Sequence, residues 1–407
     1  MSVIVVATGN LVGPGGSESY VMTIAEHLMR LGHSVHLLTR KTGLVAQAAT
    51  DVGISVRRDP ALLPRDVDIV FSLDREFALV LGSRYPRAAR IFVMHNVGEA
   101  YLPPPVDGCV QATVVLNARH EQRAEATRGA GRVIRLRQPI DTHRFSPRQS
   151  LNDRPRRVAL LGNYGGFPGD HRRRLVEAWG KDIEWLEVGG ENATMDVPAA
   201  LADVDVVVGY GRSILEAMAC ARAAYVFEHV GSAGWVTADT YAAMEADGFA
   251  GVGVRGPADV AQLRGDLESY SPELGWPGRD LVRQHHDARE HAAELVILAR
   301  DIQPQEMRVD EQQLEALAAL ARVNLLLAEI ASGGMIHAQI TGKQTHDLQR
   351  QLEEMERSAA LLEEEAASLR TWCTDLEAAI SGLQATRRYR IGAALARPLD
   401  LARRLRN

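Results

Sequence analysis

The amino-acid sequence predicts an α/β protein with two parallel-sheet domains, followed by a C-terminal helical coiled coil. Short apolar runs rich in valine and isoleucine alternate with helical stretches, and this alternation occurs in two successive series. A heptad repeat of apolar residues near the C-terminus predicts the coiled coil. We therefore expect four regions, which are 1–145, 146–304, the helical and coiled-coil region 305–386, and the basic tail 387–407.

The first series opens with a strand, a glycine-rich loop, a helix and a second strand. Residues 2–7 form an apolar run, and the loop that follows contains Gly15 and Gly16. The next helix carries its apolar residues on one face, and Gly32 ends it before a strand at 33–39. The apolar residues of that face are Val21, Ile24, Leu28 and Leu31. Further strands are expected at Val67–Phe71, Ile91–Met94, Thr113–Leu116 and Val133–Leu136.

The second series follows a proline-containing stretch and ends in a long helix. Its strands are expected at Arg157–Leu161, Ile183–Val188, Val204–Val208 and Ala224–Phe227. A glycine-rich loop is expected at 231–235, where Trp235 either stacks on a base or packs in the core. Asp280–Asp301 has the composition of a single helix, and three histidines in it resemble metal ligands: His285, His286 and His291. Adjacent histidines point to different sides of a helix, so we predict no metal site there.

The most informative segment follows the third strand of the second series. Gly209 and Gly211 let the backbone turn sharply and approach a ligand. The helix that begins at Ser213 points free N–H groups and the positive end of its dipole at this turn. Arg212 adds a cation suited to phosphate oxygens, and Glu216 can accept two hydrogen bonds from ribose hydroxyls. The segment therefore predicts a site for a nucleotide diphosphate.

This segment resembles the donor-binding region of the two-domain GT-B glycosyltransferases, in particular the large retaining group that includes family 4. The end of their signature, a Gly-aromatic-Gly loop followed by L-E-A-M-A, stands here as Gly209-Tyr210-Gly211 and Leu215–Ala219. The family has two glutamates eight positions apart, and the second corresponds to Glu216, which the resemblance implies binds the ribose. The first corresponds to Val208, which has no carboxylate. The resemblance implies two Rossmann-like domains with the donor between their sheets.

Two further stretches carry the resemblance. Gln138–Pro147 is similar to the interdomain stretch of these transferases, in which a proline, an acid, a phenylalanine and a second proline recur. The loop at 162–170 corresponds to the family's diphosphate loop, but it has Asn163 at the arginine position and no lysine. Our hypothesis is that Arg172 or Arg173, just beyond this loop, reaches back to it, or that Arg212 replaces the lost positive charge.

The resemblance also implies roles for residues of the first domain. Gly15 and Gly16 would let the first loop close over the diphosphate and the donor sugar, and His95 lies where the family often has a histidine near the transferred sugar. The catalytic residues so implied are His95 and Glu216. The donor-binding residues so implied are Gly15, Gly16, Asn163, Arg172, Gly209, Tyr210, Gly211, Arg212, Ser213 and Glu216, and no metal ligands are expected.

The implied activity is transfer of a sugar from a UDP- or GDP-linked donor to a glycan or glycolipid acceptor, with retention of configuration and without a metal. The expected setting is bacterial surface polysaccharide synthesis. A second hypothesis is a catalytically degenerate GT-B scaffold that organises a glycan-assembly complex through its coiled coil. Val208 and Asn163 favour the scaffold, whereas Glu216, His95 and the glycine loops favour catalysis.

Composition and charge limit the class of protein further. The chain has 407 residues, 46% of them hydrophobic, and a formal net charge of −6, which indicates a globular protein without generic nucleic-acid binding. Its three cysteines, Cys109, Cys220 and Cys373, include no C-x-x-C pair, which favours a reducing compartment and argues against a zinc site. No apolar stretch approaches the roughly 20 residues needed to cross a bilayer. We therefore expect a cytoplasmic protein.

Two features of the C-terminal region concern partners. The apolar spacing at 348–383 alternates between 4 and 3 residues, which predicts a homodimer through a left-handed coiled coil. An intramolecular hairpin with the helix expected at 314–331 is the alternative. The tail 387–407 contains seven arginines and one acid among apolar residues. It suits contact with anionic lipid at the inner face of the membrane, a solvated chain end, or a nucleic-acid patch.

Overall fold

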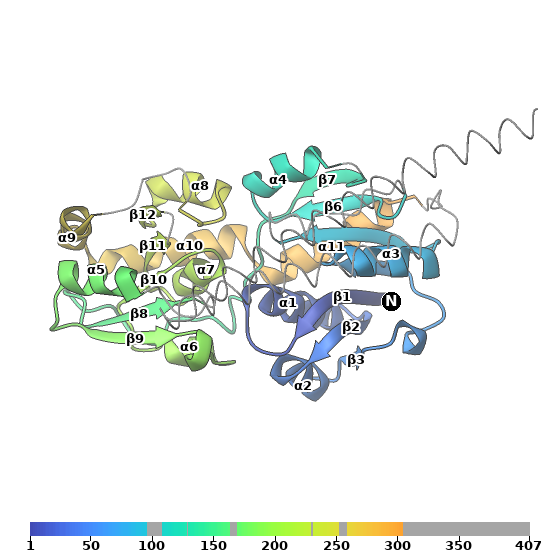
Figure 1. The fold of residues 1–407 in the computed structure, drawn as a ribbon, viewed down its shortest axis with the longest axis horizontal. Coiled ribbons are helices and arrows are strands. Elements are labelled where there is room, and N and C mark those ends of the chain that lie inside the picture. The colour runs from blue at the N-terminus through green and yellow to red at the C-terminus, as the bar shows by residue number, and fades with distance from the viewer. Residues whose placement is uncertain (96–107, 128, 163–168, 229–230, 252–258, 304–407) are drawn as a thin grey trace, which may run out of the picture. The chain divides into compact units, whose positions relative to one another are not determined.

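The structure of the chain is a computed structural model, and it describes residues 1–95, 108–127, 129–162, 169–228, 231–251 and 259–303. Two β-sheets with flanking helices make up this part (Figure 1), and they belong to one compact unit. The expected coiled coil at 348–383, the basic tail at 387–407 and Asn163 lie outside the described residues. The described part has the α/β architecture that the sequence pattern predicts.

The first sheet contains seven parallel strands in the order β3-β2-β1-β4-β5-β6-β7. They are β1 (Val3–Leu11), β2 (Ser34–Thr42), β3 (Ser55–Arg57), β4 (Ile69–Ser72), β5 (Ala89–Met94), β6 (Ala112–Val115) and β7 (Arg132–Arg135). Within β1, Ile4 and Val6 pack on one face while Val5 and Ala7 pack on the other, so both faces are covered. The sequence pattern located each of these strands except β3, whose three residues include one apolar side chain, Val56.

Helices cover both faces of this sheet. They are α1 (Gly16–Arg30), α2 (Leu44–Asp51), α3 (Arg75–Arg84) and α4 (Ala118–Glu125). The predicted apolar face of α1 is buried at Val21, Ile24 and Leu28. Leu31, which was expected on the same face, lies at the C-cap and is 37% exposed, because the helix ends one residue before it.

The second sheet contains five strands in the order β12-β11-β10-β8-β9. They are β8 (Arg157–Leu161), β9 (Glu184–Val188), β10 (Val206–Gly209), β11 (Ala223–Glu228) and β12 (Gly231–Trp235). The loop predicted at 231–235 is wrong, because this segment pairs antiparallel with β11 as an edge strand. Trp235 anchors it, since its buried ring stacks on Trp179 with the ring centroids 5.8 Å apart. Of the two roles considered for Trp235, the structure therefore has core packing.

The helices of the second half are α5 (Gly169–Trp179), α6 (Val197–Ala200), α7 (Arg212–Ala219), α8 (Ala238–Ala246), α9 (Val260–Glu268), α10 (Gly275–His285) and α11 (Ala288–Asp301). The single helix predicted at Asp280–Asp301 is instead two helices. His286 leaves the helical conformation with φ −131°, and the Asp287 carboxylate then caps α11 by accepting from the amides of Arg289 and Glu290. We call His286–Asp287 the helix break.

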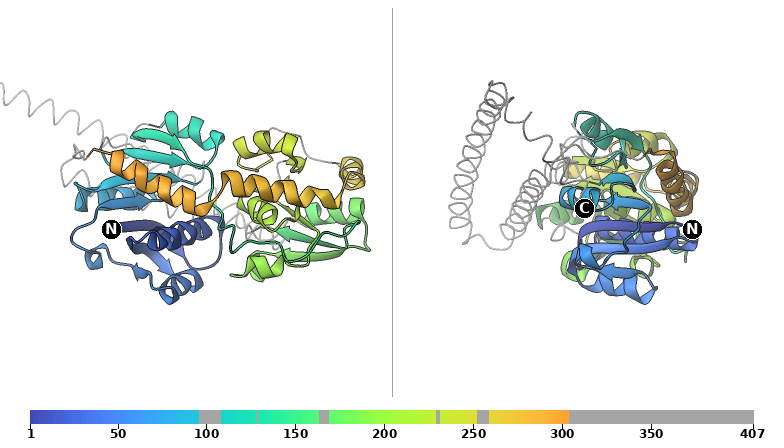
Figure 2. Two further views of the ribbon diagram at one scale, coloured as in Figure 1. Left: turned by 180° about the vertical axis from the view of Figure 1, so that it is seen from behind. Right: turned by 90° about the vertical axis from the view of Figure 1, so that its right-hand side faces the viewer.

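The last helix, α11, returns to the first sheet. Figure 2 shows α10 and α11, both orange, running one after the other along the back of the two sheets. Five apolar residues of α11 join the core between α1 and the first sheet: Ala292, Leu295, Val296, Leu298 and Ala299. Among the described residues, no helix combines the length and the apolar character needed to span a bilayer.

A glycine substitution tests the turn that leads into β7. Gly131 has φ +64°, and a Cβ there would lie 2.4 Å from the carbonyl oxygen of Gln111. We expect Gly131→Ala to destabilise the protein by about 2 kcal/mol or more, because strain and a backbone clash act together. In the matched control Gly265→Ala, within α9, a Cβ meets open space, so it should stabilise by about 0.5–1 kcal/mol. Thermal unfolding of both variants checks the pair, and equal shifts of the same sign would contradict it.

Candidate functional site

A buried histidine at the helix break holds the linker, residues 136–156, which joins β7 to β8. His286 Nδ1 lies 2.7 Å from the carbonyl oxygen of Gln138, and its Nε2 lies 2.8 Å from the hydroxyl of Tyr241 on α8. A carbonyl can only accept, so Nδ1 carries the proton and Nε2 accepts from the tyrosine. The imidazole therefore bonds the linker to a helix of the second sheet.

The same arrangement recurs one helical turn into α11. His291 Nδ1 lies 2.9 Å from the carbonyl oxygen of Arg137, and its Nε2 lies 3.0 Å from the hydroxyl of Tyr20 on α1. Burial lowers the pKa of His291 to about 4 and that of His286 to about 3, so both rings are neutral near pH 7. The two histidines thus attach neighbouring linker carbonyls to opposite halves of the protein.

The linker also pairs with the helix break through its backbone. The amide of Ile140 donates to the carbonyl of His286 at 2.7 Å, and the amide of Ala288 donates to the carbonyl of Ile140 at 3.1 Å. The neighbouring Asp141 carboxylate accepts from Arg30 of α1 at 3.0 Å. The predicted interdomain stretch Gln138–Pro147 therefore lies where the chain passes from the first sheet to the second. It is bonded to the helix break, where the chain returns toward the first sheet.

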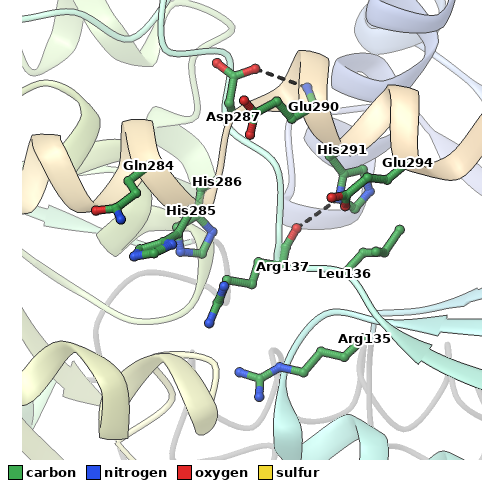
Figure 3. A pocket seen from close by; sticks show the side chains of 10 residues that line it. All are labelled: Arg135, Leu136, Arg137, Gln284, His285, His286, Asp287, Glu290, His291 and Glu294. Atoms are coloured by element: carbon green, nitrogen blue, oxygen red, sulfur yellow. Dashed lines mark hydrogen bonds between the residues drawn. The ribbon is translucent and has the colours of Figure 1, made fainter.

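A polar pocket of about 340 Å³ lies beside these contacts (Figure 3). In Figure 3 the guanidinium groups of Arg135 and Arg137 extend away from Glu290 and Glu294. Both arginines form ion pairs with Glu245 of α8, and Arg137 Nε lies 3.4 Å from its carboxylate. The pocket is lined by Arg135, Leu136, Arg137, Gln284, His285, His286, Asp287, Glu290, His291 and Glu294, none of which belongs to the predicted donor site. In the described ranges, no three His, Cys, Asp or Glu side chains lie together as a metal site requires.

The glycine turn after β10 is tightly constrained. A Cβ at Gly209 would lie 2.6 Å from both the Leu161 carbonyl oxygen and Ser213 Oγ, and Gly211 has φ +60°. Ser213 Oγ accepts from the Tyr210 amide at 3.1 Å and donates to the Tyr210 carbonyl at 2.6 Å. Glycine is therefore needed at both positions, and α7 begins at the carboxyl end of β10 as the sequence analysis expects.

Arg212 and Glu216 face inward from the first turns of α7. Arg212 Nε lies 2.8 Å from Glu216 Oε1, and its two other nitrogens donate to the Pro139 carbonyl at 2.7 Å and to Thr23 Oγ1 at 3.2 Å. Both side chains are less than a tenth exposed. Burial raises the pKa of Glu216, and the Arg212 guanidinium opposes that shift. The guanidinium therefore lies inside the protein and is bonded to protein groups, whereas the sequence analysis expects it to serve phosphate oxygens.

The other predicted residues occupy loop and helix positions at the ends of strands. Gly15 is the N-cap of α1, and a Cβ at Gly16 would meet no atom within 4 Å. His95 directly follows β5, and burial lowers its pKa to about 4. Arg172 on α5 forms an ion pair with Glu187 of β9 at 2.9 Å while remaining half exposed. The structure thus brings Arg212 and Glu216 together and engages Arg172 elsewhere.

Sequence reasoning missed several residues near these positions. His120 on α4 is buried, and burial lowers its pKa to about 4, with further lowering by nearby Arg119 and His95. Its position three residues after the Asn117 N-cap that follows β6 was the available signal. Tyr20 and Thr23 were also missed, because an aromatic and a hydroxyl on an apolar helix face usually indicate ordinary packing.

No known family profile matches this chain, and no curated protein sequence matches it significantly. Solved structures do match. HepE from Anabaena, in complex with UDP and glucose, superposes with a TM-score of 0.54 at 12% identity, over 74% of this chain and 100% of HepE. A glycosyltransferase from Rickettsia africae gives 0.52 at 13% identity, over 74% of this chain and 98% of that one. The fold is GT-B. At these identities the likeness establishes the fold alone.

The two linker histidines should make stability depend on pH. The folded pKa values of His286 and His291, about 3 and about 4, lie below the ordinary value of about 6.5. Between about pH 4 and about pH 6.5, the unfolded state therefore binds more protons than the folded state. Their contribution is complete above pH 6.5 and should fall by about 1.4 kcal/mol per histidine and pH unit as the pH drops toward 4. Urea unfolding from about pH 7 to about pH 5 measures this slope. The variant His291→Gln should flatten the slope by one proton, and an unchanged slope would exclude this origin.

Proposed function

We propose that this chain is a glycosyltransferase that transfers a hexosyl or related group from a nucleotide-sugar donor to a glycan or glycolipid acceptor. The observation that carries the proposal is the constrained glycine turn at the carboxyl end of β10, which opens α7 in a GT-B fold. The HepE structures contain UDP and, at a TM-score of 0.51, UDP-glucose. A UDP-linked donor is therefore our first candidate and a GDP-linked donor the second.

The proposed roles follow from the chemistry of each group. The N-terminus of α7 carries partial positive charge, which would stabilise the leaving diphosphate without a metal. The Glu216 carboxylate would accept from ribose hydroxyls, and the neutral His95 ring would contact the transferred sugar. Arg172 and Asn163 would complete the diphosphate contacts, with Gly15 and Gly16 closing from the first sheet. Retention of configuration is part of this proposal.

Two observations favour the alternative, a catalytically degenerate scaffold. Val208 is fully buried in the core of the second sheet, so no acid replaces the missing first glutamate at that position. Arg212 and Glu216 are engaged with each other. A scaffold would organise a glycan-assembly complex through the region at 348–383.

The remaining parts of the proposal concern the setting. We propose a bacterial protein of surface polysaccharide synthesis that works in the cytoplasm, at the inner face of the membrane. The tail 387–407 would contact anionic lipid, and the heptads at 348–383 would form a homodimer. Both segments lie outside the described residues, so the sequence pattern alone supports these statements.

Nucleotide binding separates the enzyme from the scaffold. We expect calorimetric titration with UDP, GDP, ADP and dTDP to show micromolar binding of one nucleotide. Glu216→Gln should weaken it at least tenfold, about 1.4 kcal/mol, because the ribose loses its charged acceptor. The matched control Glu184→Gln alters an exposed ion pair with Arg157 and should leave affinity unchanged. If the folded protein binds none of the four nucleotides, the scaffold is the better account.

The coiled coil has its own test. Changing Leu362 and Leu369 together to Asp places charges on the apolar seam and should convert a dimer to a monomer. Light scattering coupled to size-exclusion chromatography measures the mass directly. An unchanged mass would reject the dimer, and a wild-type monomer would favour the intramolecular hairpin.

A further inference from the structure

The first residue of α7 is bonded to three separate segments of the protein. The Arg212 guanidinium reaches Glu216 within its own helix, the Pro139 carbonyl in the linker, and the Thr23 hydroxyl on α1. Thr23 Oγ1 in turn donates to the carbonyl of Ser19. The Arg212 side chain is 6% exposed, so these partners replace the water that a guanidinium otherwise needs.

The surroundings of Arg212 leave little freedom for a role at the loop surface. Turning the guanidinium outward would break three hydrogen bonds and leave Glu216, whose side chain is 8% exposed, without its hydrogen-bonded cation. Removing one partner of a buried ion pair leaves the other charge buried and uncompensated, which is strongly unfavourable. Tyr20 and His291 also interact electrostatically with Arg212. Neither side chain is a carboxylate, so neither replaces Glu216 as the partner of the guanidinium.

We propose that Arg212 is a positioning residue, which aims the Glu216 carboxylate and ties it to the linker and to α1. This inference rests on the proposed function, in which Glu216 accepts from the ribose. Arg212 then contributes to recognition of the nucleoside and not to recognition of the diphosphate. A ligand that hydrogen-bonds to Glu216 also affects the Arg212 contacts with the linker and α1, which join the two sheets. The nucleotide site and the linker are therefore coupled through the Arg212 side chain.

The experiment compares the nucleoside with its diphosphate on the full chain. Calorimetry with uridine and with UDP, or with the corresponding pair for whichever nucleotide binds best, is run on Arg212→Met, Arg212→Lys and Thr23→Val. A positioning role predicts that Arg212→Met weakens both ligands by the same factor, at least tenfold. Arg212→Lys should restore part of the loss because it keeps the charge. Thr23→Val keeps both charges and should give a smaller loss, again equal for the two ligands.

A double-variant cycle separates positioning from general destabilisation. If Arg212 acts through Glu216, then Arg212→Met combined with Glu216→Gln should bind uridine as weakly as Glu216→Gln alone. The matched control Arg30→Met removes a bond between α1 and the linker at Asp141 without touching α7, and it should leave both affinities within about twofold of wild type. Thermal unfolding of every variant reports on folding, and Arg212→Lys and Thr23→Val carry the test if Arg212→Met does not fold.

The outcomes are distinct. Equal losses for uridine and UDP, together with a non-additive double variant, support the positioning role. A loss confined to UDP would place the guanidinium on the diphosphate and overturn the inference while leaving the proposed function intact. A further loss in the double variant would overturn it as well. Absence of nucleotide binding by the wild type would reject the proposed function and this inference with it.

Discussion

The structure depends on how the linker satisfies its backbone hydrogen bonds as it passes between the two sheets. Consecutive carbonyls of the linker accept from side chains instead of from a strand or a helix: His291 on Arg137, His286 on Gln138 and Arg212 on Pro139. Pro139 is buried, and a buried carbonyl without a partner would cost as much as a lost hydrogen bond. His291 is also bonded to α1, His286 to α8, and Arg212 to both α1 and α7, so the side chains that satisfy the linker also join the two halves.

The helix break follows from the same constraint. In a continuous helix, the carbonyl at position 286 and the amide at position 288 would be bonded within the helix. The break frees both groups, which then bond the amide and the carbonyl of Ile140. Asp287 compensates the exposed start of α11 with its carboxylate cap. The helix break is therefore the feature that lets the linker hydrogen-bond to the segment between α10 and α11, where the chain returns to the first sheet.

The fold could be predicted from sequence where a single element carries the signal. Apolar β-branched runs located strands such as β1 and β10, whereas β12 was missed because its small residues resemble a loop and one tryptophan anchors it. The direction of Arg212 could not be predicted in this way. Its deciding partners, Pro139 and Thr23, are 73 and 189 residues away in the chain, so only the folded arrangement brings them together.

The charge balance at the start of α7 decides what kind of ligand the turn can attract. A cation at a helix N-terminus opposes the helix dipole, and here Glu216 neutralises it inside the protein. The pair therefore adds little net charge to the turn, and the anion-binding capacity that remains belongs to the backbone amides and the dipole. If the loop at 162–170 binds the diphosphate as we propose, its Asn163 and its lack of a lysine leave Arg172, the backbone amides and the dipole as the groups that would attract that anion.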